Sequence, residues 1–264
     1  MEWFLGYLAT GAVAGFFAGM LGIGGGAIIV PMLVALFEAQ GLPRAHVMHL
    51  AVGTALATFL FTSMSSVRAH AGRGAIRWDI ARRMTPGILT GGLIGSGLSG
   101  YVSTAAFAAI FTVVIYAAAT GILIDRKPKA ARELPGAAGM FAAGFLFSAL
   151  SAFAAVGGAF LTIPFMMWCG VPMIEAIGTA SLIGLPIALS GSVGFMLAGM
   201  STEGLPAYSV GFVYLPALAG VVASGIFAAP LGAAVAHRTP TRWLKRIFAL
   251  LFYAVATRML IALW

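Results

Sequence analysis

The sequence has little charge and almost no cysteine. Its 264 residues include 7 acidic and 15 basic side chains, and charged residues make up only 8% of the chain. The single cysteine, Cys169, excludes an intramolecular disulfide and a metal cluster built on cysteines. Extended polar stretches that could form a soluble domain are missing as well. Because the first two residues lack a basic start and the following apolar run is long, we expect no cleaved signal peptide.

Apolar residues and glycine dominate instead. The chain is 61% hydrophobic with 35 glycines, and its mean hydropathy is +1.03. A soluble domain of this length could not cover such a surface, so we predict an all-α polytopic membrane protein. The sequence pI near 10.3 reflects clustered loop charges, and we expect no nucleic-acid partner.

Two glycine-rich breaks interrupt the apolar runs. The first spans residues 21–26, and the apolar run after it, 27–38, is short. At 1.5 Å per residue such a run is about 18 Å long, roughly half of a bilayer's hydrocarbon core. The pattern returns at residues 155–158, again before a short run that holds a proline. Paired short segments of this kind point to the binding site of a transporter.

The second half of the chain repeats the first. Apolar segments lie at about 4–23, 27–38, 46–67, 84–102 and 104–124, and again at about 136–154, 159–169, 174–199, 208–236 and 243–263. The stretches that match are 24–31 with 157–164, 53–55 with 178–180, and 116–120 with 253–257. We therefore predict two repeats of five segments, 1–124 and 136–264, joined by a charged linker at 125–135.

Loop charges predict that the repeats are inverted. Most basic residues fall in three regions, which face the cytoplasm by the positive-inside rule: 68–83, 126–132 and 237–246. The counterpart of the first region, 200–208, carries only Glu203, and the counterpart of the third, 102–104, is uncharged. Five segments per repeat is an odd number, so the second repeat enters from the opposite side. Both termini are then expected outside, in the periplasm.

The two glycine breaks, the Pro31 and Pro164 that follow them, and the Gly-Thr-Ala repeats at 53–55 and 178–180 resemble the TauE/SafE family. Its members are bacterial membrane proteins linked to export of sulfite and small organosulfonates. The likeness spans nearly the whole chain and implies an anion exporter of the bacterial inner membrane, with sulfite or an organosulfonate such as sulfoacetate as substrate. The family is broad, so another small anion, such as a carboxylate or sulfate, stays an alternative.

The half-helices after the two breaks are the expected anion site. A helix N-terminus offers free N–H groups and about half a positive charge, and glycine lets an oxyanion approach them closely. Threonine and serine hydroxyls nearby could donate hydrogen bonds to a sulfonate. The expected substrate-binding residues are Gly24, Gly25, Gly26, Thr54, Gly157, Gly158, Thr179 and Ser181. The alternatives are close helix packing for the glycines, and hydroxyl bonds to the carbonyl four residues earlier for the threonines.

A few other polar residues are candidates for lesser roles. His46 and His49 lie with Arg44 at the predicted outer mouth, where they could attract anions or carry a coupling proton. An exposed loop and helix start is the simpler interpretation. Arg258 lies inside an apolar run near the C-terminus, where snorkelling is the default and a functional role the alternative. Glu175 is expected to be structural, and so are four serines: Ser148, Ser151, Ser190 and Ser192.

These features favour a secondary transporter over an enzyme. A serine nucleophile would need a nearby base, and the candidate histidines lie near the outer surface. The chain has no Walker-type phosphate-binding motif, so we expect no ATP use and no cofactor. Alternating access would rock the two halves about the glycine breaks, coupled to a proton or sodium ion. An anion channel of the same architecture is the alternative function. A homodimer is an alternative to a monomer.

Overall fold

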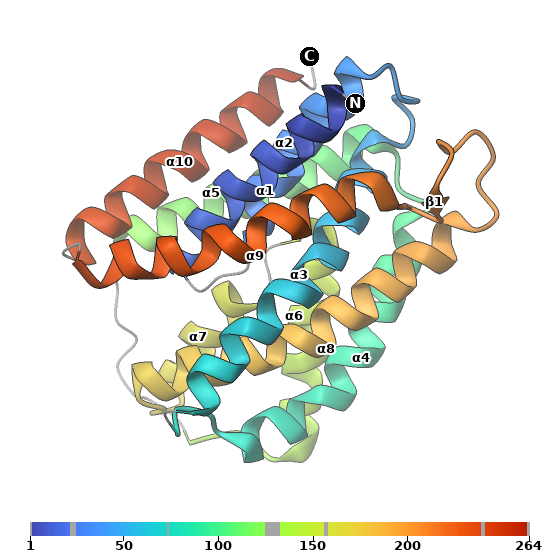
Figure 1. Cartoon of the computed structure of the whole chain (residues 1–264). Helices are drawn as coiled ribbons and strands as arrows, with labels where there is room; N and C mark the ends of the chain where they lie inside the picture. The colour runs from blue at the N-terminus through green and yellow to red at the C-terminus, as the bar shows by residue number, and fades with distance from the viewer. Residues whose placement is uncertain are drawn as a thin grey trace.

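The protein is a bundle of helices, seen in a computed structural model that describes residues 2–21, 25–72, 74–124, 133–155, 158–238 and 241–262 (Figure 1). The helices are α1 (Glu2–Leu21), α2 (Gly26–Ala39), α3 (Val47–Ala71), α4 (Trp78–Ser99), α5 (Thr104–Ile124), α6 (Ala137–Ala154), α7 (Ala159–Trp168), α8 (Met173–Gly199), α9 (Leu215–Arg238) and α10 (Thr241–Ala262). Two short strands, β1 (Ser209–Val210) and β2 (Val213–Tyr214), form an antiparallel hairpin before α9. The predicted all-α class is confirmed.

Helix length and composition separate spanning from short helices. Six of the described helices are long and apolar enough to cross a membrane: α1, α3, α5, α6, α8 and α9. The short helices α2 and α7 have 14 and 10 residues, fewer than the roughly 20 that a membrane span needs. Each follows a glycine-rich break. The predicted multi-pass architecture with two short helices is therefore confirmed.

Two predicted segment starts are wrong. The fourth helix begins at Trp78 and not near residue 84, because Asp79 in its first turn suits the positive end of a helix. Arg82 and Arg83 therefore lie in α4 and not in a loop. The ninth helix begins at Leu215 and not near residue 208, because the hairpin turns at Gly211, whose φ is 55°.

Helices α3 and α8 form the centre and run antiparallel. Gly53 of α3 lies against Phe195 of α8, whereas Phe59, further along α3, lies against Gly184, further back in α8. Helix α3 is the most enclosed of the six, because 78% of its apolar stretch Val47–Met64 is buried. Helix α9 is the least enclosed, with 28% of its stretch Leu215–Gly232 buried. The central pair is thus shielded by helices that face outward.

Close helix contacts at glycines hold the outer helices. Gly11, Gly15 and Gly19 place α1 against the backbone of α9, and Gly87, Gly91 and Gly95 place α4 against the backbone of α6. In both pairs the contacts advance together along the two helices, so each pair is parallel. Small residues allow two helix backbones to come this close. In a membrane, close packing and not the hydrophobic effect drives helix association.

Helices α5 and α10 meet in a reciprocal pair of hydrogen bonds. The hydroxyls of Tyr116 and Thr257 are 2.7 Å apart, and those of Thr120 and Tyr253 are also 2.7 Å apart. The crossing pattern shows that the two helices are antiparallel. The hydroxyls of both tyrosines are therefore bonded across this helix pair.

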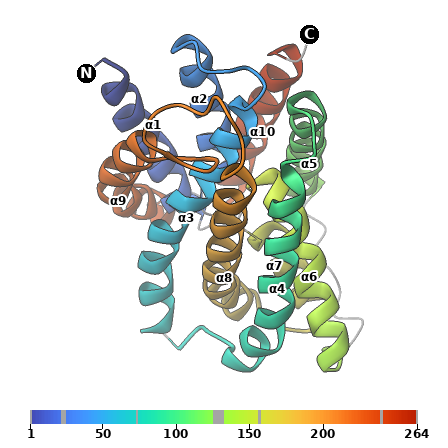
Figure 2. The same cartoon turned by 90° about the vertical axis from the view of Figure 1, so that its right-hand side faces the viewer.

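The two ends of the bundle differ in what they carry. The first turn of α1, the last turn of α10 and the β1–β2 hairpin lie at one end (Figure 2). The turn that joins α3 to α4 lies at the opposite end (Figure 2). Since the basic first turns of α4 follow that turn, positive charge gathers away from the chain ends.

Candidate functional site

The two glycine-rich breaks touch inside the bundle. A Cβ atom added at Gly26 would overlap the carbonyl oxygen of Ala155, so only glycine allows this approach. Gly25 and Ala155 both have positive φ, at 68° and 47°, which turns the chain sharply at each break. Gly24 and Gly157 lie outside the described residues. The expectation that the breaks come together therefore holds at Gly26 and Ala155.

Each break leads into a buried helix N-terminus. In α2 the N–H groups of Ile28 and Ile29 both donate to Gly25 O, and in α7 those of Leu161 and Thr162 both donate to Gly158 O. The N–H groups of the first two residues of either helix have no acceptor within it. Those first residues, Gly26 and Ala159, are buried. Both positive helix ends are thus buried, and the end of α2 lies against Ala155 of the second break.

The threonines of the two Gly-Thr-Ala stretches bind backbone N–H groups of segments that lie at the two ends of the bundle. Thr54 Oγ1 accepts a hydrogen bond from Tyr214 N–H at 3.0 Å, just before α9. Thr179 Oγ1 accepts one from Arg77 N–H at 2.9 Å, just before α4. The glycines that precede these threonines lie against carbonyl oxygens of the same two segments. Both hydroxyls therefore already act as acceptors for buried or half-buried backbone.

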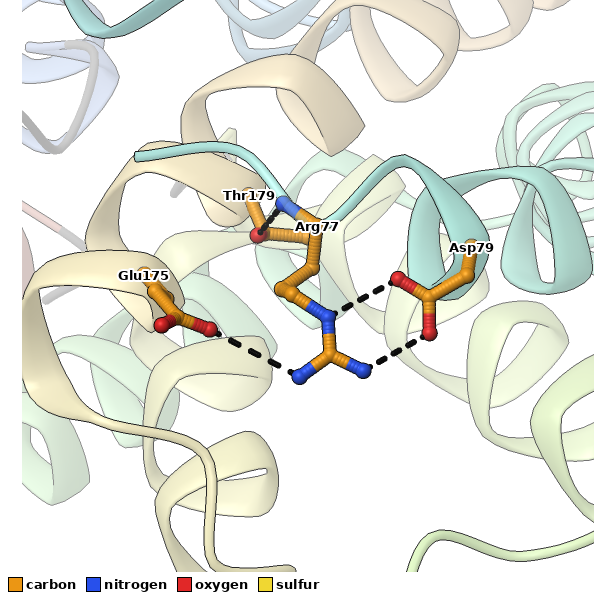
Figure 3. A network of polar contacts seen from close by, with 4 residues as sticks. All are labelled: Arg77, Asp79, Glu175 and Thr179. Atoms are coloured by element: carbon orange, nitrogen blue, oxygen red, sulfur yellow. Dashed lines mark hydrogen bonds and ion pairs between the residues drawn. The ribbon is translucent and has the colours of Figure 1, made fainter. Parts of the chain in front are cut away.

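An ion network surrounds one of these contacts (Figure 3). The Arg77 guanidinium binds both carboxylate oxygens of Asp79, at 2.9 and 2.8 Å, and lies 3.6 Å from Glu175 Oε2. The hydrogen bond from Arg77 lowers the pKa of the Asp79 carboxyl, which lies ahead of the predicted membrane segment. Glu175 comes from the first turn of α8, as the structural interpretation expected. The network ties the α3–α4 turn to α8.

Replacing either threonine by valine should destabilise the protein. Thr54→Val or Thr179→Val leaves a backbone N–H without its acceptor, which costs about 1–3 kcal/mol. For a chain of this size each kcal/mol lowers Tm by about 2–4 °C. Thermal melting in detergent measures the change. Thr58→Val is the matched control, because the buried Thr58 hydroxyl only donates to Thr54 O within its own helix. An equal fall in Tm for the control would contradict a stabilising role of the hydrogen bonds that Thr54 and Thr179 accept.

The structure also places three further candidates. Ser181 donates to Ile177 O within α8. Arg258 is exposed on α10, which suits snorkelling. His49 differs from the exposed loop that was expected: its side chain is buried, its Nε2 lies 3.0 Å from both Ser99 O and Val102 O, and its ring packs between Phe107 and Phe212.

Several buried polar groups were not predicted from the sequence or were expected to be only structural. The hydroxyls of Ser148, Ser151 and Thr162 are buried and have no hydrogen-bond partner among the described residues. Tyr7 pairs with Gln40 at 2.8 Å and packs edge-on against Phe37 and Tyr214. Periodicity gives no signal for such groups, because their role depends on which helix lies opposite.

Comparison with known proteins agrees with this architecture. Residues 7–259 match the family model described as sulfite exporter TauE/SafE. A probable membrane transporter protein of Haemophilus influenzae is 34% identical over 253 residues, which cover 96% of each chain. Similar proteins, also named probable membrane transporters, occur in Methanocaldococcus jannaschii (24% identity, 90% of this chain and 88% of the relative) and Bacillus subtilis (23% identity, 96% of each). No solved structure matches.

Proposed function

Because the chain belongs to the sulfite exporter TauE/SafE family, we propose that it is a secondary transporter that exports a small sulfur oxyanion across the bacterial inner membrane. The substrate class is sulfite or an organosulfonate such as sulfoacetate. Membership of a transporter family and relatives named as transporters also agree with the absence of an enzymatic role.

One observation carries the choice of an anion. The N-termini of α2 and α7 are both buried, and their breaks touch at Gly26 and Ala155. A buried positive helix end is stabilised by negative charge placed near it. An oxyanion bound to backbone amides supplies that charge without a basic side chain. The proposed site is formed by the glycines of both breaks, with Thr54, Thr179 and Ser181 as the surrounding hydroxyls.

Alternating access is supported by the relations between the halves. An inverted duplication requires equivalent helices to run antiparallel, as α3 does with α8 and α5 with α10. It also requires equivalent contacts to recur, as the bonds of Thr54 and Thr179 do. We propose that the two repeats rock about the touching breaks and expose the site to either side in turn.

Transport measured in proteoliposomes tests the proposal. Vesicles with purified protein, loaded with sulfite, sulfoacetate, sulfate or acetate, should release sulfite or sulfoacetate at a rate that saturates with concentration. A proton or sodium gradient should change that rate, with His49 as the proposed proton carrier. A flux that never saturates and ignores both gradients would favour a channel. Release of acetate alone would overturn the sulfur oxyanion as substrate.

Thiol labelling tests the proposed orientation, in which both termini are periplasmic. With Cys169 replaced by alanine, a cysteine at the exposed position Glu203 should react with an impermeant reagent added outside intact cells. A cysteine at the exposed position Arg82 should react only after the membrane is opened. The reverse pattern would contradict the positive-inside assignment. Blue native electrophoresis of the same samples would show whether a homodimer forms.

A further inference from the structure

The second break carries polar groups that the first one lacks. Thr162 lies in the first turn of α7, fully buried, and its hydroxyl has no partner among the described residues. Ser151, in the last turn of α6 before the break, is also buried and unpartnered. The residues at the matching positions of the first repeat are Ile29 and Ala18. Among the described residues, two buried hydroxyls without a partner therefore flank the second break, and the matching positions of the first break hold apolar side chains.

The Thr162 hydroxyl differs from several other buried hydroxyls in the helices. These bond to the carbonyl four residues earlier, as Thr58 does to Thr54 O and Thr112 does to Ala108 O. For Thr162 that carbonyl is Gly158 O, which receives N–H groups from Leu161 and from Thr162 itself. A buried hydroxyl left without a partner costs about 1–3 kcal/mol. Such a group calls for an explanation.

The position of the Thr162 side chain indicates where a hydrogen-bond partner of its hydroxyl would lie. Side chains of a helix tilt toward its N-terminus, so the Thr162 side chain lies over the first turn of α7. Its Cγ2 atom is 3.9 Å from the place that a Cβ of Gly158 would occupy. The rings of Phe147 in α6 and Phe165 in α7 are 5.4 Å apart. Ser151 lies one turn after Phe147, in the last turn of α6, which leads into the same break.

We propose that the N-terminus of α7, with the hydroxyls of Thr162 and Ser151, is the half of the site that binds the oxyanion directly. This inference rests on the proposed transport of an oxyanion and makes its site asymmetric. The amides of α7 and the two hydroxyls donate to the anion, and the end of α2 contributes charge without hydroxyls. Ser148, one turn before Ser151, continues the line of hydroxyls toward Gly92 of α4 and Ser190 of α8.

Binding and melting of Thr162→Val test the proposal. Valine keeps the shape of threonine but cannot donate, so affinity for sulfite or methanesulfonate, measured by calorimetry in detergent, should fall about tenfold to hundredfold. Thr162→Ser keeps the hydroxyl and should bind nearly as the wild type does. Without anion, Thr162→Val should melt at or above the wild-type temperature, because the unpaired group is gone. Ser151→Ala should weaken binding in the same direction.

The controls separate this inference from the proposed function. Thr58→Val removes another buried hydroxyl, one that is already bonded, and should leave anion affinity unchanged. If Thr162→Val binds as tightly as wild type, or melts lower without anion, the inference is overturned while transport by the wild type can still stand. If the wild type neither binds nor transports sulfite or methanesulfonate, the proposed function fails as well.

Discussion

Replacing Gly26 by alanine should abolish transport while the protein still folds. The added Cβ would overlap the carbonyl oxygen of Ala155, and backbone cannot move aside as a side-chain end can. The two breaks must then separate, which moves the positive helix ends apart and opens their contact to water. Overpacking a close contact costs about 1–3 kcal/mol, which a folded chain can tolerate. Anion release from proteoliposomes should therefore fall to the level of empty vesicles.

Gly158 supplies the matched control for this result. The nearest atom to a Cβ added there would be the terminal Cδ1 of Ile187, and the next two are at ordinary contact distance; a side-chain end can rotate away. Gly158→Ala should therefore fold without separating the breaks, and its transport should fall less than that of Gly26→Ala, with the loss confined to the closer approach of the anion to Gly158. Melting temperature and elution from a sizing column confirm that each variant is folded. Normal transport by Gly26→Ala would show that contact between the breaks is not needed.

Sequence could predict the helices and the breaks because both are local signals. Apolar runs near 20 residues mark spanning helices, and the glycines at 21–26 and 155–158 mark where they stop. The matching Gly-Thr-Ala stretches pointed to two threonines that each accept a hydrogen bond from backbone of another segment. What they bind could not be predicted, since the partner of Thr179 is the backbone of Arg77, 102 residues away.

The errors have the same origin. His49 looked exposed because it follows a polar loop, but carbonyl oxygens at the end of α4 and beyond it, Ser99 O and Val102 O, draw it inside. Thr162 was passed over as one more residue of a short apolar helix. Its interest comes from lacking a partner, which no pattern along a single chain reveals. Contacts between distant segments are therefore the part that sequence reasoning could not supply.

Leucine at Gly87 and Gly91 together should prevent the protein from folding. Added side chains at these positions would overlap the carbonyl oxygens of Phe141 and Phe145, so α4 could no longer pack against α6. Each overlap costs about 1–3 kcal/mol or more, and the total stability of a protein is only about 5–15 kcal/mol. In a membrane no hydrophobic effect between helices compensates for lost packing. The yield of monodisperse protein after detergent extraction should drop sharply.

Gly97 of the same helix separates packing from helix propensity. Apart from the neighbouring backbone of its own helix, no described atom lies within 4 Å of the place where its Cβ would be, so Gly97→Leu adds a side chain into open space. Leucine favours a helix over glycine by up to about 1 kcal/mol, and this variant should melt at or slightly above the wild-type temperature. If Gly97→Leu lowers the yield as much as the double variant, bulk on α4 and not its contact with α6 would be the cause. A stable Gly87→Leu/Gly91→Leu protein would mean that the α4–α6 pair can separate without unfolding, and the close contacts at its glycines would then be dispensable for the fold.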